Sequence, residues 1–326
     1  MNYIVLDLEW NQCPYGKAYG KKSLPFEIIE IGAVKLNEDR EILSEFHRII
    51  KPKEYKKIHY KTQKVIHLTE KQLNAGTAFE KAMREFFEWC SPQDCFCTWG
   101  ISDLTELQRN MDYFKVKNVF PKPFFYYDVQ ELMAIELEEY DKRRTLENAV
   151  EYFDIKKERE FHGAGGDAFY TAKILQTLDW EKVRIYYTFN YYRHPQNKEE
   201  EISAIYPNGS KFVSREFATK ERAMKDRNLI TMQCYKCGRS LRNKVKWFAA
   251  QQRVYESVYK CPKHGLMLSK IRFKSVANGN YFAIKSIESA DDEIYKAVIE
   301  RKEQIKIRRR QRNNLLKRRK AVEKRV

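Results

Sequence analysis

The 326-residue chain is long enough for a hydrophobic core and a second module, and its contents of 43% hydrophobic and 14% aromatic residues indicate a folded protein. No segment approaches the ~20 apolar residues of a membrane span, and the N-terminus lacks the pattern of a signal peptide. Seven cysteines, an odd number, favour a reducing compartment over a disulfide framework, so we expect a cytoplasmic protein with no membrane partner.

The formal net charge of +17 is unevenly distributed. Residues 1–180 sum to about −4 and residues 181–326 to about +21, counting Lys and Arg against Asp and Glu. This division predicts a catalytic module beside a module that binds a polyanion, and we favour nucleic acid as that polyanion. Lysine-rich surfaces that only aid solubility are the alternative.

The first 180 residues carry the pattern of one mixed α/β domain. Strands are predicted at 3–9, 27–36 and 42–50, with a Gly/Pro/Lys loop between the first two. Helices and short strands follow: a helix at 77–90, a buried strand at 94–100, a helix at 103–114, a strand and a helix within 124–137, and helices at 145–155 and from Asp167 to Leu178.

The remaining chain divides into three predicted segments. Residues 181–230 are tyrosine-rich and are predicted to form a helical linker, broken by a turn at YPNGS (206–210). Residues 231–285 are predicted to form short strands around cysteines. Residues 286–326 are predicted to form a basic helical tail, in which 300–326 hold thirteen Lys or Arg and three acids.

Two acids lie on the first predicted strand. Asp7 and Glu9 are two residues apart, so their side chains point to the same side, whereas Leu8 points into the core. Two acids ending an apolar strand repel each other unless a cation offsets them. The alternative is a pair of ordinary polar positions on one face of a sheet.

Two later acids lie at predicted helix starts. Asp103 follows the strand CFCTWG, and Asp167 begins the helix DAFYTAKILQTL. Four carboxylates at strand ends and helix starts can converge on one edge of a sheet, where two divalent cations would balance their charge. Because all ligands are oxygens, Mg²⁺ or Mn²⁺ is favoured over zinc. Two such ions can activate a water and stabilise the leaving oxygen of a phosphodiester.

A glycine-rich turn, FHGAGGDAFY (161–170), precedes the last of these helices. GAGGDA lacks the lysine and spacing of a P-loop and the spacing of a dinucleotide site. One interpretation is close packing of the turn against another backbone, with His162 an ordinary buried histidine. The other is a catalytic histidine held ahead of the helix.

Three motifs together resemble the DEDDh 3′–5′ exonuclease superfamily, which includes RNase T and the epsilon subunit of bacterial polymerase III. They are DLE (7–9), WGISD (99–103) and HGAGGDA (162–168), the last matching H-x-A-x-x-D-A at each fixed position. The W-G-x-x-D form and the stretches 26–34 and 66–89 are most similar to KapD and enhancer-of-RNAi-type exonucleases. The resemblance covers roughly residues 1–178.

The resemblance implies an RNase H-like fold with a mixed five-stranded sheet. It implies that Asp7 bridges both metal ions and that Glu9 and Asp167 complete the site of the ion holding the attacking water. Asp103 would serve the second ion, partly through water. His162 would take a proton from the attacking water, with the glycines allowing its loop to move over the metal; an unperturbed histidine pKa of about 6.5 suits that role.

One position departs from the family pattern, because Trp10 follows D-x-E where a small or polar residue is common. Trp10 would stack on or wedge against the terminal base, or pack under the loop 12–24. Leu8 and Trp10 are therefore the candidate substrate contacts. Asp128 resembles a family acid that orders the sheet end, and we do not expect it to be a ligand.

A second metal signature lies in the basic half. CYKCG (234–238) and CPKHG (261–265) each place two ligands two residues apart before a glycine, which predicts a zinc ribbon. Its structural zinc would be bound by Cys234, Cys237, Cys261 and His264, with chance clustering of reduced cysteines as the alternative. Basic residues surround this site as on a nucleic-acid-binding surface: Lys236, Arg239, Arg242, Lys244 and Lys246.

These observations predict a metal-dependent 3′–5′ exonuclease that releases 5′-mononucleotides from nucleic acid, with RNA favoured over DNA by the branch resemblance. The expected cofactors are two Mg²⁺ or Mn²⁺ ions and one structural Zn²⁺. A proofreading or repair DNA exonuclease, and a nucleic-acid-binding adaptor with an inactive nuclease fold, are the alternatives. The basic tail is a candidate contact for nucleic acid or for a protein partner.

Overall fold

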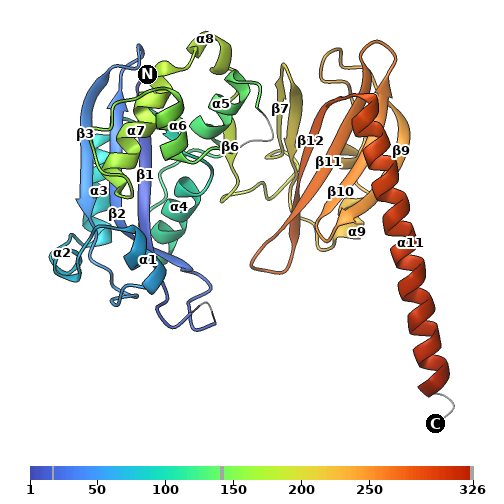
Figure 1. Cartoon of the computed structure of the whole chain (residues 1–326), viewed down its shortest axis with the longest axis horizontal. Helices are drawn as coiled ribbons and strands as arrows, with labels where there is room; N and C mark the ends of the chain where they lie inside the picture. Colours follow the sequence, from blue (N-terminus) through green and yellow to red (C-terminus); the bar gives the residue numbers. More distant parts are fainter. Residues whose placement is uncertain (17, 140–142, 324–326) are drawn as a thin grey trace. The chain divides into compact units, whose positions relative to one another are not determined.

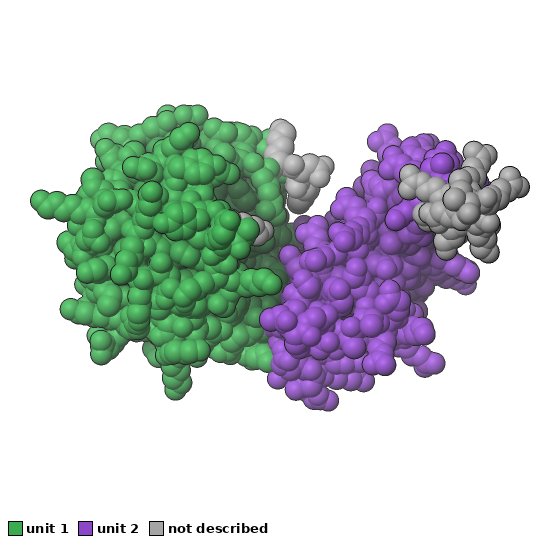
Figure 2. All heavy atoms as spheres, turned by 90° about the horizontal axis from the view of Figure 1, so that it is seen from below, with its two compact units in different colours: residues 1–193 green, residues 194–326 purple. Residues whose placement is uncertain are grey.

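The computed structural model describes the chain except residues 17, 140–142 and 324–326, and describes no side chains in 316–323. It divides into two compact units, residues 1–193 and 194–326, coloured separately in Figure 2. Each unit is built around its own six-stranded sheet. Within the described residues, every helix is too short or too polar to cross a lipid bilayer.

The sheet of the first unit has the strand order β3-β2-β1-β4-β5-β6. The strands are β1 (Tyr3–Gln12), β2 (Phe26–Leu36), β3 (Ile42–Ile49), β4 (Cys95–Thr98), β5 (Phe124–Asp128) and β6 (Thr188–Asn190). β1 is antiparallel to β2 and parallel to β4, so the sheet is mixed, as predicted. The predicted count of five strands is wrong, because the three-residue β6 adds an antiparallel edge next to β5. So short a strand shows no alternation in the sequence.

Helices cover both faces of this sheet (Figure 1). They are α1 (Tyr60–Val65), α2 (Glu70–Asn74), α3 (Phe79–Trp89), α4 (Asp103–Tyr113), α5 (Val129–Glu136), α6 (Leu146–Tyr152), α7 (Ala164–Thr177) and α8 (Trp180–Val183). Side chains alternate along β1: Leu6 and Leu8 pack with α3 and α4 on one face, and Val5 packs with α7 on the other. Asp7 and Glu9 therefore lie on the α7 face of the sheet.

The second unit is an antiparallel sheet in the order β7-β8-β12-β11-β10-β9. Its strands are β7 (Ile202–Tyr206), β8 (Gly209–Val213), β9 (Arg242–Gln251), β10 (Val254–Cys261), β11 (Gly265–Ser275) and β12 (Tyr281–Ala290). Its helices are α9 (Lys220–Ala223), α10 (Arg227–Ile230) and α11 (Asp292–Glu323).

The predicted helical linker over residues 181–230 is wrong. This segment holds β6, β7 and β8 and only the short helices α8, α9 and α10. Tyr206 pairs with Gly209, so the predicted turn is the two-residue loop of a β-hairpin. The tyrosines and β-branched residues of this segment favour strands once a neighbouring strand is available, and β12 supplies it by pairing with β8.

The basic tail begins later than predicted and is partly docked. β12 continues to Ala290, and the helix starts at Asp292 rather than within residues 286–290. Val298 is buried against Val258 and Leu268 of the sheet, with Ile305 partly buried beside them. Beyond Ile305 the described side chains of α11 are exposed. The apolar positions of the tail, although sparse, therefore fix its first turns to the sheet.

Candidate active site and zinc site

The first strand presents Asp7 and Glu9 opposite two specific residues of β2. In the register of this antiparallel pair, Asp7 faces Gly32 and Glu9 faces Glu30. A Cβ atom on Gly32 would lie 2.1 Å from the carbonyl carbon of Ala164. Only glycine therefore allows the first residue of α7 to rest on the sheet beside Asp7.

This close approach brings the carboxylates of two distant segments together. Asp167 lies in the first turn of α7, and Asp7, Glu9 and Asp167 each offer an oxygen within 4.8 Å of the others. Oxygen ligands at this spacing fit a hard divalent cation. The structure thus assembles three of the four predicted acids into one candidate metal centre.

The acids of this cluster are buried close together and repel one another. Burial raises the pKa of Asp7 well above its usual range, and the charges of Asp103 and Asp167 raise it further. Burial and the charge of Asp167 raise the pKa of Glu9 to about 8. Burial raises the pKa of Asp167 to about 6. Such shifts mark buried carboxylates that need a cation in order to ionise together.

Asp103 lies beside this cluster but outside the set of three. It is the first residue of α4, only 5% exposed, and its Oδ1 accepts a hydrogen bond from the Leu8 N–H at 3.3 Å. Burial raises its pKa to about 7, although the hydrogen bond from Leu8 opposes the rise. Asp128 fixes the turn that precedes α4, because its Oδ1 accepts a hydrogen bond from the Gly100 N–H at 3.0 Å.

His162 precedes α7 in an unusual backbone conformation. Its φ of 62° lies in the left-handed region, and its N–H donates a hydrogen bond to Asp167 Oδ1 at 3.2 Å. Its ring is half exposed, with Nε2 3.8 Å from Glu147 Oε1. The turn therefore orients the Asp167 carboxylate while leaving the imidazole accessible.

Two glycines after His162 lie in the helix α7 and not, as predicted from the sequence, in a loop ahead of it. α7 begins at Ala164, not at Asp167, so Gly165 and Gly166 lie inside its first turn. A Cβ on Gly166 would lie 2.2 Å from the Glu160 carbonyl oxygen. Gly166 is therefore explained by close packing of the turn on the helix, and the helix starts early because this packing outweighs the low helix propensity of glycine.

Sequence analysis missed one acid of this site, Glu30. It is 5% exposed, and its Oε1 lies 2.6 Å from Nε2 of His47 on β3. Its charge contributes to the raised pKa of both Asp7 and Glu9. The signal was a single acid inside the otherwise apolar run IIEIGAV, a costly residue to bury without a reason.

The two candidate substrate contacts lie away from the acids. Leu8 is 3% exposed within the core that packs against α3 and α4, so its side chain is not available to a substrate. Trp10 is partly buried on the same face, with its ring centroid 5.6 Å from that of Phe26. Phe26 is the first residue of β2, directly after the loop, so this contact favours the packing alternative for Trp10. What Leu8 contributes is its backbone N–H, which fixes Asp103.

The four predicted zinc ligands converge in the second unit. Ligand atoms of Cys234, Cys237, Cys261 and His264 all lie within 4.8 Å of one another. Cys237 Sγ and Cys261 Sγ are 3.8 Å apart, and Cys234 Sγ is 3.4 Å from His264 Nδ1. A tetrahedral zinc with Zn–S bonds of about 2.3 Å places two sulfurs about 3.8 Å apart, so the site fits that ion.

Local backbone geometry prepares these ligands. Gly238 and Gly265 have φ values of 69° and 78°, which close the two turns. Burial alone would raise the pKa of Cys261, but the N–H groups of Lys263 and His264 lower it to about 6. A thiolate is the form that binds zinc, so this turn favours the binding state at Cys261, whereas burial raises the pKa of Cys234.

Comparison with known proteins identifies the first unit. Residues 5–175 match the RNase T family, described as "Exonuclease". The chain belongs to this exonuclease family. Membership confirms the DEDDh 3′–5′ exonuclease superfamily predicted from the three motifs. The probable 3′-5′ exonuclease KapD of Bacillus subtilis (strain 168) is 27% identical over 183 residues, which cover 55% of this chain and 85% of that protein.

Solved exonuclease structures are similar at lower identity. The nuclease domain of 3′hExo, a DEDDh family member bound to rAMP, is 16% identical and covers 58% of this chain and 96% of its own, with a TM-score of 0.48. E. coli exonuclease I in complex with a dA16 oligonucleotide is 12% identical and covers 83% of this chain and 54% of its own, with a TM-score of 0.47.

Proposed function

We propose that this exonuclease removes 5′-mononucleotides from the 3′ end of RNA, using Mg²⁺ or Mn²⁺ ions held by Asp7, Glu9, Asp103 and Asp167. The observation that carries the proposal is the convergence of three of these acids within 4.8 Å. Their raised pKa values support it, because a purely structural cluster gains nothing from crowding carboxylates whose charges repel.

The residues fit such ions by their chemistry. All the donors are carboxylate oxygens, the ligands that Mg²⁺ and Mn²⁺ prefer. When bound, two divalent ions lower the pKa of a water and neutralise the charge that develops on the phosphate and the leaving oxygen. Asp7 would be the shared ligand, with Glu9 and Asp167 on one side and Asp103 on the other. The hydrogen bond from Leu8 orients Asp103 for that task.

His162 would act as the general base. In the hydrolysis a water oxygen bonds to phosphorus, the bond from phosphorus to the O3′ atom of the preceding nucleotide breaks, and that oxygen takes a proton from solvent water. The terminal nucleotide leaves with its 5′-phosphate. The imidazole of His162 would accept the proton of that water, a contribution of typically about 10²–10⁴-fold in rate. Its half-exposed ring and the hydrogen bond from its N–H to Asp167 support this role.

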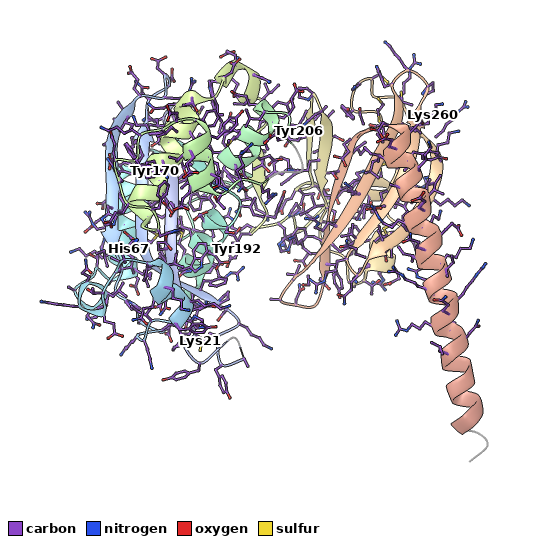
Figure 3. The ribbon with its side chains drawn as sticks, in the orientation of Figure 1. Lys21, His67, Tyr170, Tyr192, Tyr206 and Lys260 are labelled. Atoms are coloured by element: carbon purple, nitrogen blue, oxygen red, sulfur yellow. The ribbon has the colours of Figure 1, made fainter. Side chains whose placement is uncertain are left out.

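Substitution of His162 tests this role. His162→Ala should lower the rate of the chemical step by at least about 10²-fold and flatten its rise with pH. His67→Ala, which removes an exposed histidine preceding α2 (labelled in Figure 3), is the matched control and should leave the rate unchanged. A loss below about tenfold in His162→Ala would remove the base from the proposal.

The substrate is tested with matched oligonucleotides. 5′-Labelled RNA and DNA of one sequence are incubated with Mg²⁺ or Mn²⁺, and the products are followed over time. RNA should shorten from its 3′ end in single-nucleotide steps and faster than DNA, with 5′-mononucleotides released. Equal or faster cleavage of DNA would favour a repair or proofreading enzyme, and no metal-dependent cleavage of either would indicate an adaptor.

The second unit is part of the proposal as a binding module. The basic residues around the Cys/His cluster and the exposed part of α11 would hold nucleic acid while the first unit cleaves it. α11 carries no evident base-reading set, so this binding would be independent of sequence.

A further inference from the structure

On one face of β11 in the second unit, the side chains change from apolar to basic along the strand. On β11, Met267, Ile271 and Phe273 point into the cores on the side of the Cys/His cluster and of α9. On the opposite face, Leu268 packs with Val298 of α11. That face continues through Lys270, Arg272 and Lys274, because every second residue of a strand points the same way.

This basic face lies beyond the cover of α11. Arg272 and Lys274 are exposed, whereas Leu268 in the same row is buried beneath the helix. In Figure 1, α11 passes over β9 and β10, while the loop that joins β11 to β12 lies at the lower left of the sheet, away from the helix. Successive cations on this face are two residues apart, which is about 7 Å along a strand.

Another exposed cation lies in the neighbouring turn, on the opposite face. Arg253 precedes β10, whose first residue, Val254, pairs with Arg272. The Arg253 carbonyl accepts the Phe273 N–H at 2.8 Å, and its guanidinium donates to Ser275 Oγ at 3.3 Å. Ser275 belongs to the row of Ile271 and Phe273, so Arg253 lies on the other face of β11 and does not extend the row of Arg272 and Lys274.

Arg272 and Lys274 have no acidic partner among the residues that the structure describes. Lys270, next in the row, pairs with Glu288 at 3.0 Å, and Arg301 of α11 pairs with Glu256 at 2.6 Å. No such pair involves Arg253, Arg272 or Lys274. Partial desolvation and the charges of Arg272 and Arg253 instead lower the pKa of Lys274. The fold holds like charges together on a regular surface without neutralising them.

We infer that Arg272 and Lys274 form a phosphate-binding face for the nucleic acid on which the proposed exonuclease acts. The inference rests on that proposed function for the identity of the polyanion. It concerns a surface separate from the basic residues around the Cys/His cluster and from the exposed part of α11. Residues 194–326 carry a net charge of about +19, so a polyanion is the complementary partner.

The advantage of such a face is retention of the substrate. A site joined by the chain to the nuclease unit raises the effective concentration of a long substrate there without a new contact at the reacting bond. Arginine and lysine binding to phosphates releases counterions, so each bound phosphate contributes a salt slope of about 0.7 for single strands. The face should therefore affect long substrates and not the turnover of very short ones.

The test is a charge reversal in the full chain, Arg272→Glu with Lys274→Glu. Binding of a long single-stranded RNA is measured between about 50 and 200 mM salt, in an Asp7→Asn background that prevents hydrolysis. We expect weaker binding and a salt slope smaller by about 0.7 for each phosphate that is no longer bound. With Asp7 intact, turnover of a saturating trinucleotide should match wild type. Lys81→Glu with Arg84→Glu is the matched control: both lie exposed on α3, which packs on the sheet face opposite Asp7.

A second variant guards against loss of folding. Arg272→Gln with Lys274→Gln removes the charges without introducing acids and should show an intermediate loss of affinity at an unchanged melting temperature. A salt slope equal to wild type, or a change equal to that of the control, would overturn the inference. If charge reversal reduces the salt slope but the protein with Asp7 intact cleaves neither RNA nor DNA, the inference is kept and the proposed function is overturned. The two failures are therefore distinguishable.

Discussion

The two metal-competent clusters of this chain are assembled in opposite ways. The Cys/His cluster is local, because each of two tight turns supplies two ligands separated by two residues. The acid cluster joins β1 to α7, elements far apart in the sequence, through the contact between Gly32 and Ala164. A cluster built from turns is encoded by spacing, whereas a cluster built by topology exists only after the sheet has formed.

The clusters also differ in the chemistry of their ligands. Three thiols and an imidazole form a closed set for one zinc ion, with the pKa of Cys261 lowered toward the binding form. The acids have raised pKa values and depend on exchangeable ions to ionise together. The mildly acidic unit thus carries a set of ligands that suits catalytic ions, and the strongly basic unit carries a set that suits a structural ion.

Removing the shared acid should have the largest effect. Asp7→Asn should lower cleavage by more than the about 10²–10³-fold that loss of one charge-stabilising donor costs. The fold should be kept or stabilised, since burial and repulsion already disfavour this charge. Asp39→Asn, an exposed acid between β2 and β3, is the control for rate and melting temperature. Cleavage at the wild-type rate by Asp7→Asn would reject the centre.

Breaking the Cys/His cluster should disrupt the second unit and leave the activity of the first unit intact. Cys234→Ser should lose zinc, measured as metal content per chain, and should increase amide hydrogen exchange across residues 231–285. Cleavage of very short oligonucleotides should persist, because residues 1–193 form their own unit. Cys90→Ser, in the first unit, should keep its zinc. Wild-type protein purified without chelator and lacking zinc would exclude the site.

The acid cluster should make stability depend on pH when Mg²⁺ is absent. Folding raises the pKa of Asp167 to about 6, of Asp103 to about 7 and of Glu9 to about 8. A carboxylate whose pKa is raised on folding contributes stability below its unfolded value, near 4, and that contribution disappears as pH rises through the folded value. The melting temperature should therefore fall as pH rises toward 8 in magnesium-free buffer.

Added Mg²⁺ should reverse this fall, since cation binding favours the ionised acids. The difference in melting temperature with and without Mg²⁺ should grow with pH in the wild type. At each pH this difference should be smaller in Asp7→Asn. A difference that is constant across this range would show that the carboxylates do not form one ion-binding set.

The sequence anticipated those parts of the molecule that depend on local spacing. Asp7, Glu9, Asp103 and Asp167 are predicted because each lies in a short motif, and the zinc ligands because of their two-residue spacing. Glu30 was missed, because it joins the acids only through its register with Glu9. Pairing between strands is set by tertiary structure and leaves little local signal.

Two of the wrong expectations have the same origin. Residues 181–230 were expected to be helical, but their short segments pair with strands distant in the sequence, such as β12 with β8. α7 was expected to start at Asp167, since glycine disfavours helices. Its actual start at Ala164 depends on a contact with Gly32 that no local pattern reveals. In both cases tertiary contacts override propensity.

The smallest expected effect concerns the tail, and the structure defines where to cut it. Arg301 pairs with Glu256, and Ile305 packs on the sheet, so removal from residue 300 would also uncover the sheet. Removal of residues 307–326 spares these contacts and deletes ten Lys or Arg and one acid. Binding of long substrates should weaken, and the salt slope should fall by about 0.7–0.9 for each phosphate that the truncated protein no longer binds.

Turnover of a saturating short oligonucleotide should stay near wild type in this truncation, because the acids lie in the other unit. A chain with Arg308, Arg309, Arg310 and Arg312 each changed to Gln keeps the helix length and separates charge from length, since glutamine is a good helix former. It should reproduce part of the change in salt slope. Equal slopes for full-length, truncated and substituted proteins would exclude the exposed part of α11 as a nucleic-acid contact and would assign it to a protein partner.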